Sequence, residues 1–262
     1  MRALITGSHG TIGTELKNYL LSIGDEVVEW NRDEIAIDNY AVMEKFVRES
    51  NVDVVYHLAI ASRPTFRENE NWLVNYDWPS EISWICRTLN IKFLFVSSVL
   101  VFSDLAKGPF TKDSIPDAFQ EYGRIKRMAE ERVISQNPKT IVARLGWQIG
   151  TKIGSNNMLD FFEKEMQSKK EVRASNLWLP ACSFISDTVV ELVRLVKENC
   201  IGIYMLDSNK KWNFFEIASE LNRINGNPWK IVPAINFVFD QRMFDANVKI
   251  PSLNKKLTGL SK

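Results

Sequence analysis

The chain has 262 residues, 45% of them hydrophobic, which is enough to fill the core of one large domain or of a large domain with a smaller partner. Its 33 basic and 32 acidic residues leave a formal charge of +1, so the composition indicates neither a nucleic-acid-binding nor a membrane-binding surface. Three widely spaced cysteines and two histidines fit neither a disulfide framework nor a zinc motif, and we predict no metal site. The first expected strand begins at Arg2, which leaves no room for a signal peptide, and no apolar run reaches the ~18 residues that span a bilayer. We therefore expect a cytoplasmic protein.

The opening stretch predicts a phosphate-binding turn. A short apolar run from Arg2 to Thr6 is followed by glycines at positions 7, 10 and 13 and then by a helical pattern from Thr14 to Leu21. Phosphate binds well at such a turn, because missing side chains let it approach the backbone while free N–H groups and the helix dipole face its charge. The G-x-x-G-x-x-G spacing differs from the commonest dinucleotide fingerprint, and an ordinary tight turn is the alternative.

Strands and helices alternate beyond this turn. We predict strands at Arg2 to Thr6, Glu26 to Trp30, Val52 to Leu58, Lys92 to Ser98 and Thr140 to Leu145, with helices at Tyr40 to Glu49, Asn69 to Asn90 and Gln120 to Ser135. This order predicts an α/β fold with a doubly wound parallel sheet. On the first strand of such a sheet, the glycine turn is expected to bind the pyrophosphate of a dinucleotide.

The end of the second strand indicates which dinucleotide is bound. An acidic side chain here would bind the ribose hydroxyls of NAD, whereas Asn31 and Arg32 offer an uncharged group followed by a guanidinium. We therefore predict NADP as the cofactor, with NAD as the alternative. A solvated surface charge is the other interpretation of Arg32.

Two segments carry candidate catalytic groups. Ser98 ends the fourth predicted strand, and the carboxyl ends of the strands in such a sheet face the ligand. Tyr122 and Lys126 lie four residues apart in a predicted helix, so the phenol and the ammonium share one face and can address one ligand.

The second half of the chain is less regular. We expect a helix at Met158 to Ser168, an extended piece at Leu177 to Phe184, a helix after a cap at Asp187, a strand at Ile201 to Leu206 and a helix from a capping box at Asn213 to about Ile224. We predict a dinucleotide-binding domain at residues 1–150, with 187–208 returning to it. Residues 151–186 and 209–262 would form a smaller lobe that binds the substrate.

Taken together, these motifs resemble the extended short-chain dehydrogenase/reductase superfamily, and within it the dTDP-4-dehydrorhamnose reductases. The resemblance covers nearly the whole chain: the glycine loop from Ile5 to Gly13, Val96-Ser-Ser98 with Val101-Phe102, the Tyr-x-x-x-Lys of Tyr122 and Lys126, and Arg144-Leu-Gly-Trp147 with Lys152, Gly154 and Asn156-Asn157. The last segment is specific to the reductase subgroup. The resemblance implies a Rossmann-type fold with a small carboxyl-terminal substrate lobe.

The resemblance also implies roles for single residues. Tyr122 would be the general acid that protonates a substrate carbonyl as hydride arrives, Lys126 would bind the nicotinamide ribose and lower the pKa of the phenol from about 10, and Ser98 would hold the carbonyl oxygen. The implied cofactor-binding residues are Gly7, His9, Gly10, Thr11, Ile12, Gly13, Asn31, Arg32, Asp38, Leu58, Ala59, Ala61, Asn75 and Lys126. The implied substrate-binding residues are Val99, Leu100, Tyr122, Trp147, Asn157 and Trp178.

Two departures concern the sugar. Rhamnose-pathway reductases usually have Thr-Asp-Tyr where this chain has Ser98-Val99-Leu100, and their Asp-Gln-x-Gly-x-Pro segment is Ser175 to Pro180 here, with Trp178 in it. We predict NADPH-dependent reduction of a keto group on a nucleotide-linked deoxysugar, with the sugar left open. The alternatives are an epimerase or dehydratase of the same superfamily, or a non-catalytic NADP-binding regulatory subunit. The oligomeric state also stays open, and a homodimer is one assembly the sequence allows.

Overall fold

The computed structural model describes residues 1–61, 67–151 and 156–261. The chain divides into two compact units. Unit 1 comprises residues 1–103, 116–144 and 189–204, and unit 2 comprises residues 104–115, 145–188 and 205–262. These limits differ from the expected domains in four places, because residues 104–115, 145–150, 187–188 and 205–208 belong to unit 2. The pairing of Phe110 with Met243 explains the first difference, since it ties the loop at 104–115 to the carboxyl-terminal segment.

Unit 1 is built on a six-stranded sheet of order β10-β5-β4-β3-β1-β2. β1 pairs in parallel with both β2 and β3, and β3 pairs in parallel with β4. The strand order therefore reverses at β1, and ligands of such sheets bind outside the carboxyl ends of the strands at this switch point. The strands are β1 (Arg2–Thr6), β2 (Glu26–Glu29), β3 (Val54–His57), β4 (Lys92–Ser98), β5 (Ile141–Leu145) and β10 (Gly202–Leu206).

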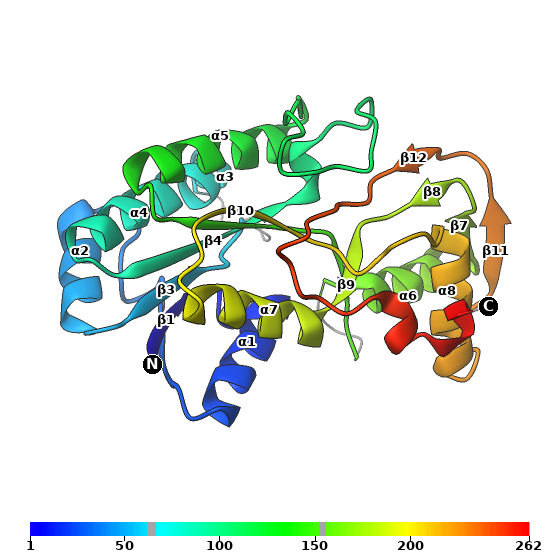
Figure 1. Ribbon diagram of the computed structural model, residues 1–262, viewed down its shortest axis with the longest axis horizontal. Helices are drawn as coiled ribbons and strands as arrows, with labels where there is room; N and C mark the ends of the chain where they lie inside the picture. Colours follow the sequence, from blue (N-terminus) through cyan, green and yellow to red (C-terminus); the bar gives the residue numbers. More distant parts are fainter. Residues whose placement is uncertain (62–66, 152–155, 262) are drawn as a thin grey trace. The chain divides into compact units, whose positions relative to one another are not determined.

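Helices cover both faces of this sheet (Figure 1). α2 (Tyr40–Glu49), α4 (Trp78–Thr88) and α5 (Glu121–Gln136) lie on one face, and α1 (Thr11–Ser22) and α7 (Ile185–Lys197) lie on the other. An ion pair of 3.3 Å between Lys197 and Asp25 joins the end of α7 to the loop after α1. Three short elements complete unit 1: α3 (Glu70–Trp72), the π-helical turn η1 (Leu73–Asp77) and the 3-10 turn η2 (Val99–Val101).

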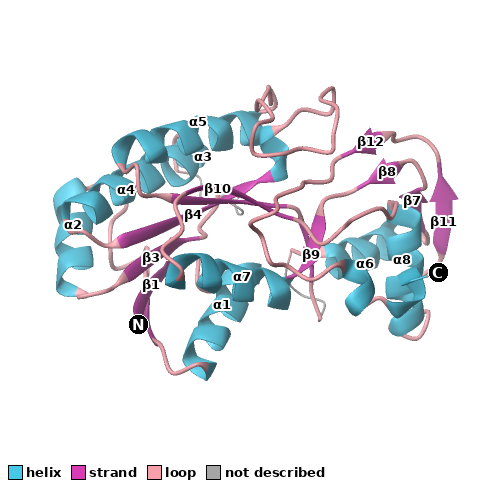
Figure 2. Cartoon of the chain, in the orientation of Figure 1, coloured by secondary structure: helices cyan, strands magenta, loops and turns pink. Residues whose placement is uncertain are grey.

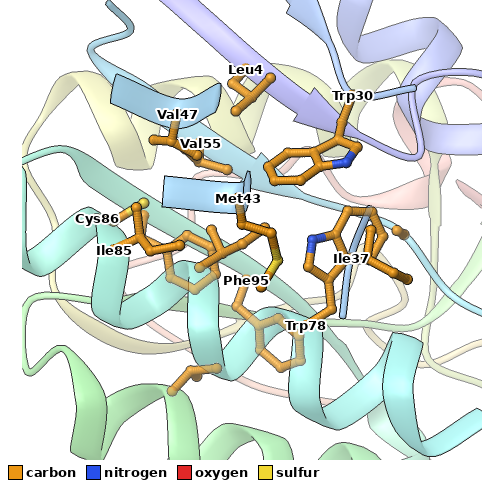
Figure 3. Close-up of a cluster of buried hydrophobic side chains, with 14 of the residues drawn as sticks. Leu4, Trp30, Ile37, Met43, Val47, Val55, Trp78, Ile85, Cys86 and Phe95 are labelled. Atoms are coloured by element: carbon orange, nitrogen blue, oxygen red, sulfur yellow. The ribbon is translucent and has the colours of Figure 1, made fainter. Parts of the chain in front are cut away.

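Burial on both sides explains the apolar runs in the central strands. All four residues of β3 are buried, as expected for a parallel strand between two helical layers. Figure 3 shows Trp30 and Trp78 at the centre of this core, with their ring centroids 5.4 Å apart in an edge contact. Met43 from α2 and Phe95 from β4 pack into the same cluster.

In its described part, unit 2 contains two helices of its own, the start of α7, and three pairs of short parallel strands (Figure 2). Capping boxes begin both helices, α6 (Met158–Lys169) at Asn157 and α8 (Phe214–Ile224) at Asn213. The strand pairs are β6 (Trp147–Ile149) with β9 (Cys182–Phe184), β7 (Val172–Ser175) with β11 (Ile231–Ala234), and β8 (Trp178–Leu179) with β12 (Phe239–Asp240); the 3-10 turns η3 (Leu253–Lys255) and η4 (Thr258–Ser261) follow.

Several local predictions were wrong. α7 begins at Ile185, so Asp187 lies in its first turn and is not its cap. The helix expected from Asn69 to Asn90 is divided by the π-helical turn, and α1 begins at Thr11, three residues before the helical pattern. Within the described residues, no helix is both long and apolar enough to cross a membrane.

Candidate active site

The turn after β1 forms an open anion cradle. Gly7 has a φ of +72° and its carbonyl accepts the N–H of Gly10 at 3.0 Å, which closes the turn. Gly10 is the N-cap of α1 without a side-chain cap, and the first turn of α1 contains no acidic residue. A Cβ on Gly13 would lie 2.1 Å from the Gly7 oxygen, so only glycine fits there. The free N–H groups of this turn can therefore bind a phosphate.

A cavity of about 520 Å³ opens beside the cradle. It brings together seven of the predicted cofactor-binding residues: Gly7, His9, Gly10, Asn31, Arg32, Leu58 and Ala59. Within the described part of the chain, seven do not line it: Thr11, Ile12, Gly13, Asp38, Ala61, Asn75 and Lys126. Sequence reasoning missed Ser8, Glu29, Trp30, Asp33, Ile60 and Trp78, which complete the lining.

The hydroxyl of Thr6 links the end of β1 to the end of β3 near the cavity. Thr6 Oγ1 accepts the N–H groups of Leu58 at 3.2 Å and Ala59 at 3.3 Å, and it lies 3.1 Å from His57 Nδ1. The Leu58 N–H is shared with the Thr6 carbonyl at 3.2 Å, and His57 Nε2 is buried with no hydrogen-bond partner among the described residues. Burial holds the pKa of His57 well below its ordinary value, so the ring is neutral.

Two of the charged side chains at the cavity, Arg32 and Glu29, form ion pairs. Arg32 lies 3.4 Å from the carboxylate of Glu70, and it is the sole lysine or arginine in the lining described here. Glu29 pairs with Lys17, and hydrogen bonds from Lys17 and Ser8 lower the pKa of this carboxyl. Asp38, one of the predicted cofactor-binding residues, forms an ion pair with Arg67. The cavity therefore combines one guanidinium with the carboxylates of Glu29 and Asp33.

Tyr122 and Lys126 lie one turn apart on α5, as predicted. Lys126 is 1% exposed, donates to the Val96 carbonyl at 3.0 Å and lies 4.5 Å from the Phe95 ring centroid. Burial lowers the pKa of its ammonium to about 7, against the opposing charge of Glu130. The pKa of Tyr122 is raised by burial to about 12, which is opposite to the lowering by Lys126 that the resemblance implied. The phenol is therefore protonated and able to donate at neutral pH.

Ser98 and its neighbours form the turn after β4. The Ser98 hydroxyl accepts the N–H of Leu100 at 3.1 Å and caps η2. Val99 is 4% exposed and Leu100 is 44% exposed, so of these two predicted substrate-binding residues Leu100 is the accessible one.

Asn75 lies in the π-helical turn behind α5. Its amide donates to Asn71 Oδ1 at 2.6 Å, and the amide of Asn71 donates to Glu121 Oε1 at 2.7 Å. Glu121 directly precedes Tyr122, so this chain of hydrogen bonds links the π-helical turn to the start of α5. The side-chain oxygen of Asn75 is buried and has no hydrogen-bond partner among the described residues. π-Helical turns occur frequently at functional sites.

A buried ion pair lies one turn beyond Lys126. Glu130 and Arg144 are 3% and 2% exposed. Arg144 Nε donates to Glu130 Oε1 at 2.9 Å and Nη2 donates to Oε2 at 2.6 Å, while the guanidinium lies 5.1 Å from the Phe102 ring centroid. The sequence contains Arg144 in a recognisable motif, but spacing alone did not predict its partner.

In unit 2, two predicted substrate-binding residues form an aromatic cluster. Trp147 and Trp178 stack with ring centroids 5.9 Å apart, and both contact Phe214. Asn157, also predicted to bind substrate, is 2% exposed and caps α6 by accepting the N–H of Leu159. Lys152 and Gly154 of the reductase-specific segment lie outside the described residues. Among described residues, no group of histidine, cysteine or carboxylate side chains could hold a metal ion.

Comparisons with known proteins agree with this architecture. A family model described as "RmlD substrate binding domain" matches residues 1–236. A dTDP-4-keto-6-deoxy-D-glucose reductase of Streptomyces niveus is 22% identical over 237 residues, which cover 88% of this chain and 82% of that protein. The beta subunit of methionine adenosyltransferase 2 of Xenopus laevis is 24% identical over 234 residues, covering 83% and 70%.

A solved structure gives the same result for the fold. The dTDP-4-dehydrorhamnose reductase of Bacillus anthracis, in complex with NADP, superposes with a TM-score of 0.82 at 18% identity and covers 98% of this chain and 96% of that one. The predicted doubly wound α/β fold is confirmed.

Proposed function

Because the chain belongs to the RmlD substrate binding domain family, we propose that it is an NADPH-dependent reductase of a keto group on a nucleotide-linked deoxysugar. One observation carries the proposal: Tyr122 and Lys126 share a face of α5 in the same unit as the glycine cradle and its cavity. The names of relatives support it, since a dTDP-4-keto-6-deoxy-D-glucose reductase covers 88% of the chain.

In this reaction, residues of unit 1 would donate the proton to the substrate carbonyl oxygen. A bound nicotinamide dinucleotide would supply the hydride. A carbonyl that accepts hydride develops negative charge on oxygen, and the phenol of Tyr122, protonated at neutral pH, can transfer a proton to it. Ser98 would hold the same oxygen by a hydrogen bond, and Lys126 would bind the nicotinamide ribose.

One side chain of the cavity, Arg32, favours NADP over NAD as the cofactor. Arg32 can bind a 2′-phosphate by exchanging its 3.4 Å contact with Glu70 for the phosphate oxygens. The carboxylates of Glu29 and Asp33 in the same lining repel a 2′-phosphate and so favour NAD. The ion pair with Lys17 offsets the negative charge of Glu29. The relative from Bacillus anthracis, in complex with NADP, supports this choice.

We assign dinucleotide binding to unit 1 and substrate binding to unit 2. In unit 2, Trp147 and Trp178 supply apolar stacking surface for a nucleotide-sugar, while the N-cap role of Asn157 leaves its side chain less available. Two finer expectations belong to the proposal: the enzyme works in the cytoplasm, and it forms a homodimer, which light scattering of the purified protein would test.

A second function is favoured by a specific observation. The methionine adenosyltransferase 2 subunit beta of Xenopus laevis is named as a subunit of another enzyme, and it is 24% identical over 83% of this chain. A non-catalytic subunit needs no proton donor, so the Tyr122 and Lys126 pair weighs against it. An epimerase or dehydratase would use the same pair with no net oxidation of cofactor.

The test is Tyr122→Phe, which removes only the hydroxyl. We expect it to bind NADPH as the wild type does, measured by nicotinamide fluorescence, and to lose about 10²–10⁴-fold in turnover of a nucleotide-4-ketosugar, measured by absorbance. Tyr40→Phe, on the surface of α2, is the matched control and should leave both quantities unchanged. Wild-type protein that binds NADPH without oxidising it with any ketosugar would contradict the reductase assignment.

A further inference from the structure

A second cavity lies in unit 1, at the edge of the sheet opposite to the glycine cradle. It has a volume of about 630 Å³ and lies where β4 and β5 begin, at Lys92 and Ile141. The cradle follows the end of β1, and β1, β3 and β4 are parallel, so the two cavities are at opposite edges. Small-molecule sites have volumes of about 300–1,000 Å³, so this cavity has room for a ligand of its own.

The charged side chains in the described lining of this cavity are all positive. Arg87, Lys92 and Lys139 supply three cations, and no aspartate or glutamate lines the cavity within the described residues. We call it the basic cavity after these three residues. The cavity beside the glycine cradle differs, because one arginine there shares the lining with two carboxylates.

Two acids close to the basic cavity are engaged with other partners. Glu198, just after α7, forms an ion pair with Arg194. Asp53 accepts the N–H of Lys92 on its carbonyl at 3.1 Å, but its carboxylate accepts the N–H of Arg2 at 2.7 Å. These two carboxylates therefore do not compensate the cations of the lining.

Backbone carbonyls hold two of the cations in place. Arg87 Nη1 donates to the Gln136 carbonyl at 3.0 Å, and Lys92 Nζ donates to the Val196 carbonyl at 3.2 Å. These carbonyls belong to the last turns of α5 and α7, and the end of a helix carries only about half a negative charge, so each cation keeps an excess of positive charge. A guanidinium has five N–H donors and an ammonium has three, so donors remain for a ligand.

The rest of the lining is neutral. Asn90 and Asn199 contribute side-chain amides, while Ile91 and Ile201 contribute apolar surface. A few polar groups beside apolar side chains are typical of a site that orients a small molecule by one polar end. In the basic cavity that end has to be an anion.

We propose that the basic cavity binds a small organic phosphate, with its phosphate group on Arg87, Lys92 and Lys139 and its apolar part on Ile91 and Ile201. Three cations match a phosphate monoester, which carries nearly two negative charges at neutral pH, better than a carboxylate with one. Arginine also offers the planar fork that fits phosphate oxygens. This site goes beyond the proposed function, because it uses neither the glycine cradle nor Tyr122.

The experiment uses phenyl phosphate as the probe and a cysteine as the reporter. Cys200 is partly exposed and lines the basic cavity, whereas Cys86 and Cys182 are buried. The rate at which iodoacetamide alkylates Cys200 is measured by mass spectrometry. Phenyl phosphate at about ten times its dissociation constant should slow this rate about tenfold. An unchanged rate at millimolar phenyl phosphate overturns the proposal.

A lysine variant tests the role of the cations. Lys139 is exposed, so Lys139→Gln should fold as the wild type does and should weaken the binding of phenyl phosphate about twofold to fivefold. Lys139→Arg keeps the charge and should restore wild-type binding. Lys164→Gln, at an exposed position of α6, is the matched control. Equal binding by Lys139→Gln and Lys164→Gln contradicts the proposal.

Two further comparisons identify the ligand class and the place of binding. Benzoate should protect Cys200 less than phenyl phosphate does, and equal protection would overturn the choice of phosphate. Because the glycine cradle can also bind phosphate, the measurement is repeated with Gly13→Ala, which should keep the wild-type protection of Cys200. Loss of protection in that variant would place the phosphate in the cradle and overturn the second site. Neither outcome depends on whether the protein reduces a ketosugar.

Discussion

At the scale of single residues, the site depends on side chains that are absent as much as on those present. Gly13 and Gly7 lie so close that the missing Cβ atoms bring the backbone of α1 against the turn after β1. Gly7 would also place a Cβ 2.9 Å from the backbone of Ala59, at the end of β3. These close approaches hold the turn, whose Gly7 and Gly10 line the cavity, against α1 and the segment after β3.

The first prediction concerns Gly13→Ala. The added methyl would lie 2.1 Å from the Gly7 oxygen, so the turn has to move. Relieving such an overlap costs about 1–3 kcal/mol, and we expect NADPH affinity to fall roughly tenfold to a hundredfold, measured by fluorescence titration. Glu15→Ala, exposed on the same helix, should bind as wild type does. Equal affinities in the two variants would show that the cradle does not hold the pyrophosphate.

At the scale of elements, both local sequence signals and tertiary contacts determine where helices and turns form. The capping box at Asn213 was predicted from the sequence, and the structure confirms it: Asn213 Oδ1 accepts the N–H of Glu216 at 2.9 Å, and Glu216 Oε2 accepts the N–H of Asn213 at 2.8 Å. By contrast, no local signal marked the π-helical turn at Asn75.

The second prediction concerns Asn213→Ala. The variant loses the side-chain acceptor that begins α8, and its free energy of unfolding should fall by about 1 kcal/mol. Denaturation by urea, followed by circular dichroism, measures this. Asn236→Ala, in an exposed loop, is the control and should change stability by less than about 0.5 kcal/mol. A control as unstable as the variant would remove the capping explanation.

At the scale of the whole molecule, the two histidines have opposite environments. The side chain of His9 is 91% exposed, whereas His57 is fully buried and neutral. Burial depresses the pKa of His57 in the folded state, so below pH 6.5 the unfolded chain binds a proton that the folded chain does not. His57 therefore makes stability rise with pH up to about 6.5.

The third prediction follows from this linkage. Between pH 5 and pH 6.5, His57 should contribute roughly 1–2 kcal/mol to the rise in the free energy of unfolding. Replacement His57→Asn should remove most of this rise, and His9→Asn should keep it, as measured by urea denaturation at both pH values. If His9→Asn is the variant that flattens the curve, the linkage to burial is wrong.

The sequence by itself determined the fold class, the glycine cradle and the Tyr122 and Lys126 pair. Apolar periodicity, glycine spacing and the four-residue helical repeat are local properties of the sequence, so they can be recognised without knowing which distant segments pack together. Only the tertiary structure brought Glu29, Trp78 and Arg32 to one cavity, set Arg144 against Glu130 across 14 residues, and moved residues 104–115 into unit 2. These features depend on which chain segments pack together, and the cost of burying a charge or of closing a turn is decided by partners far away in the sequence.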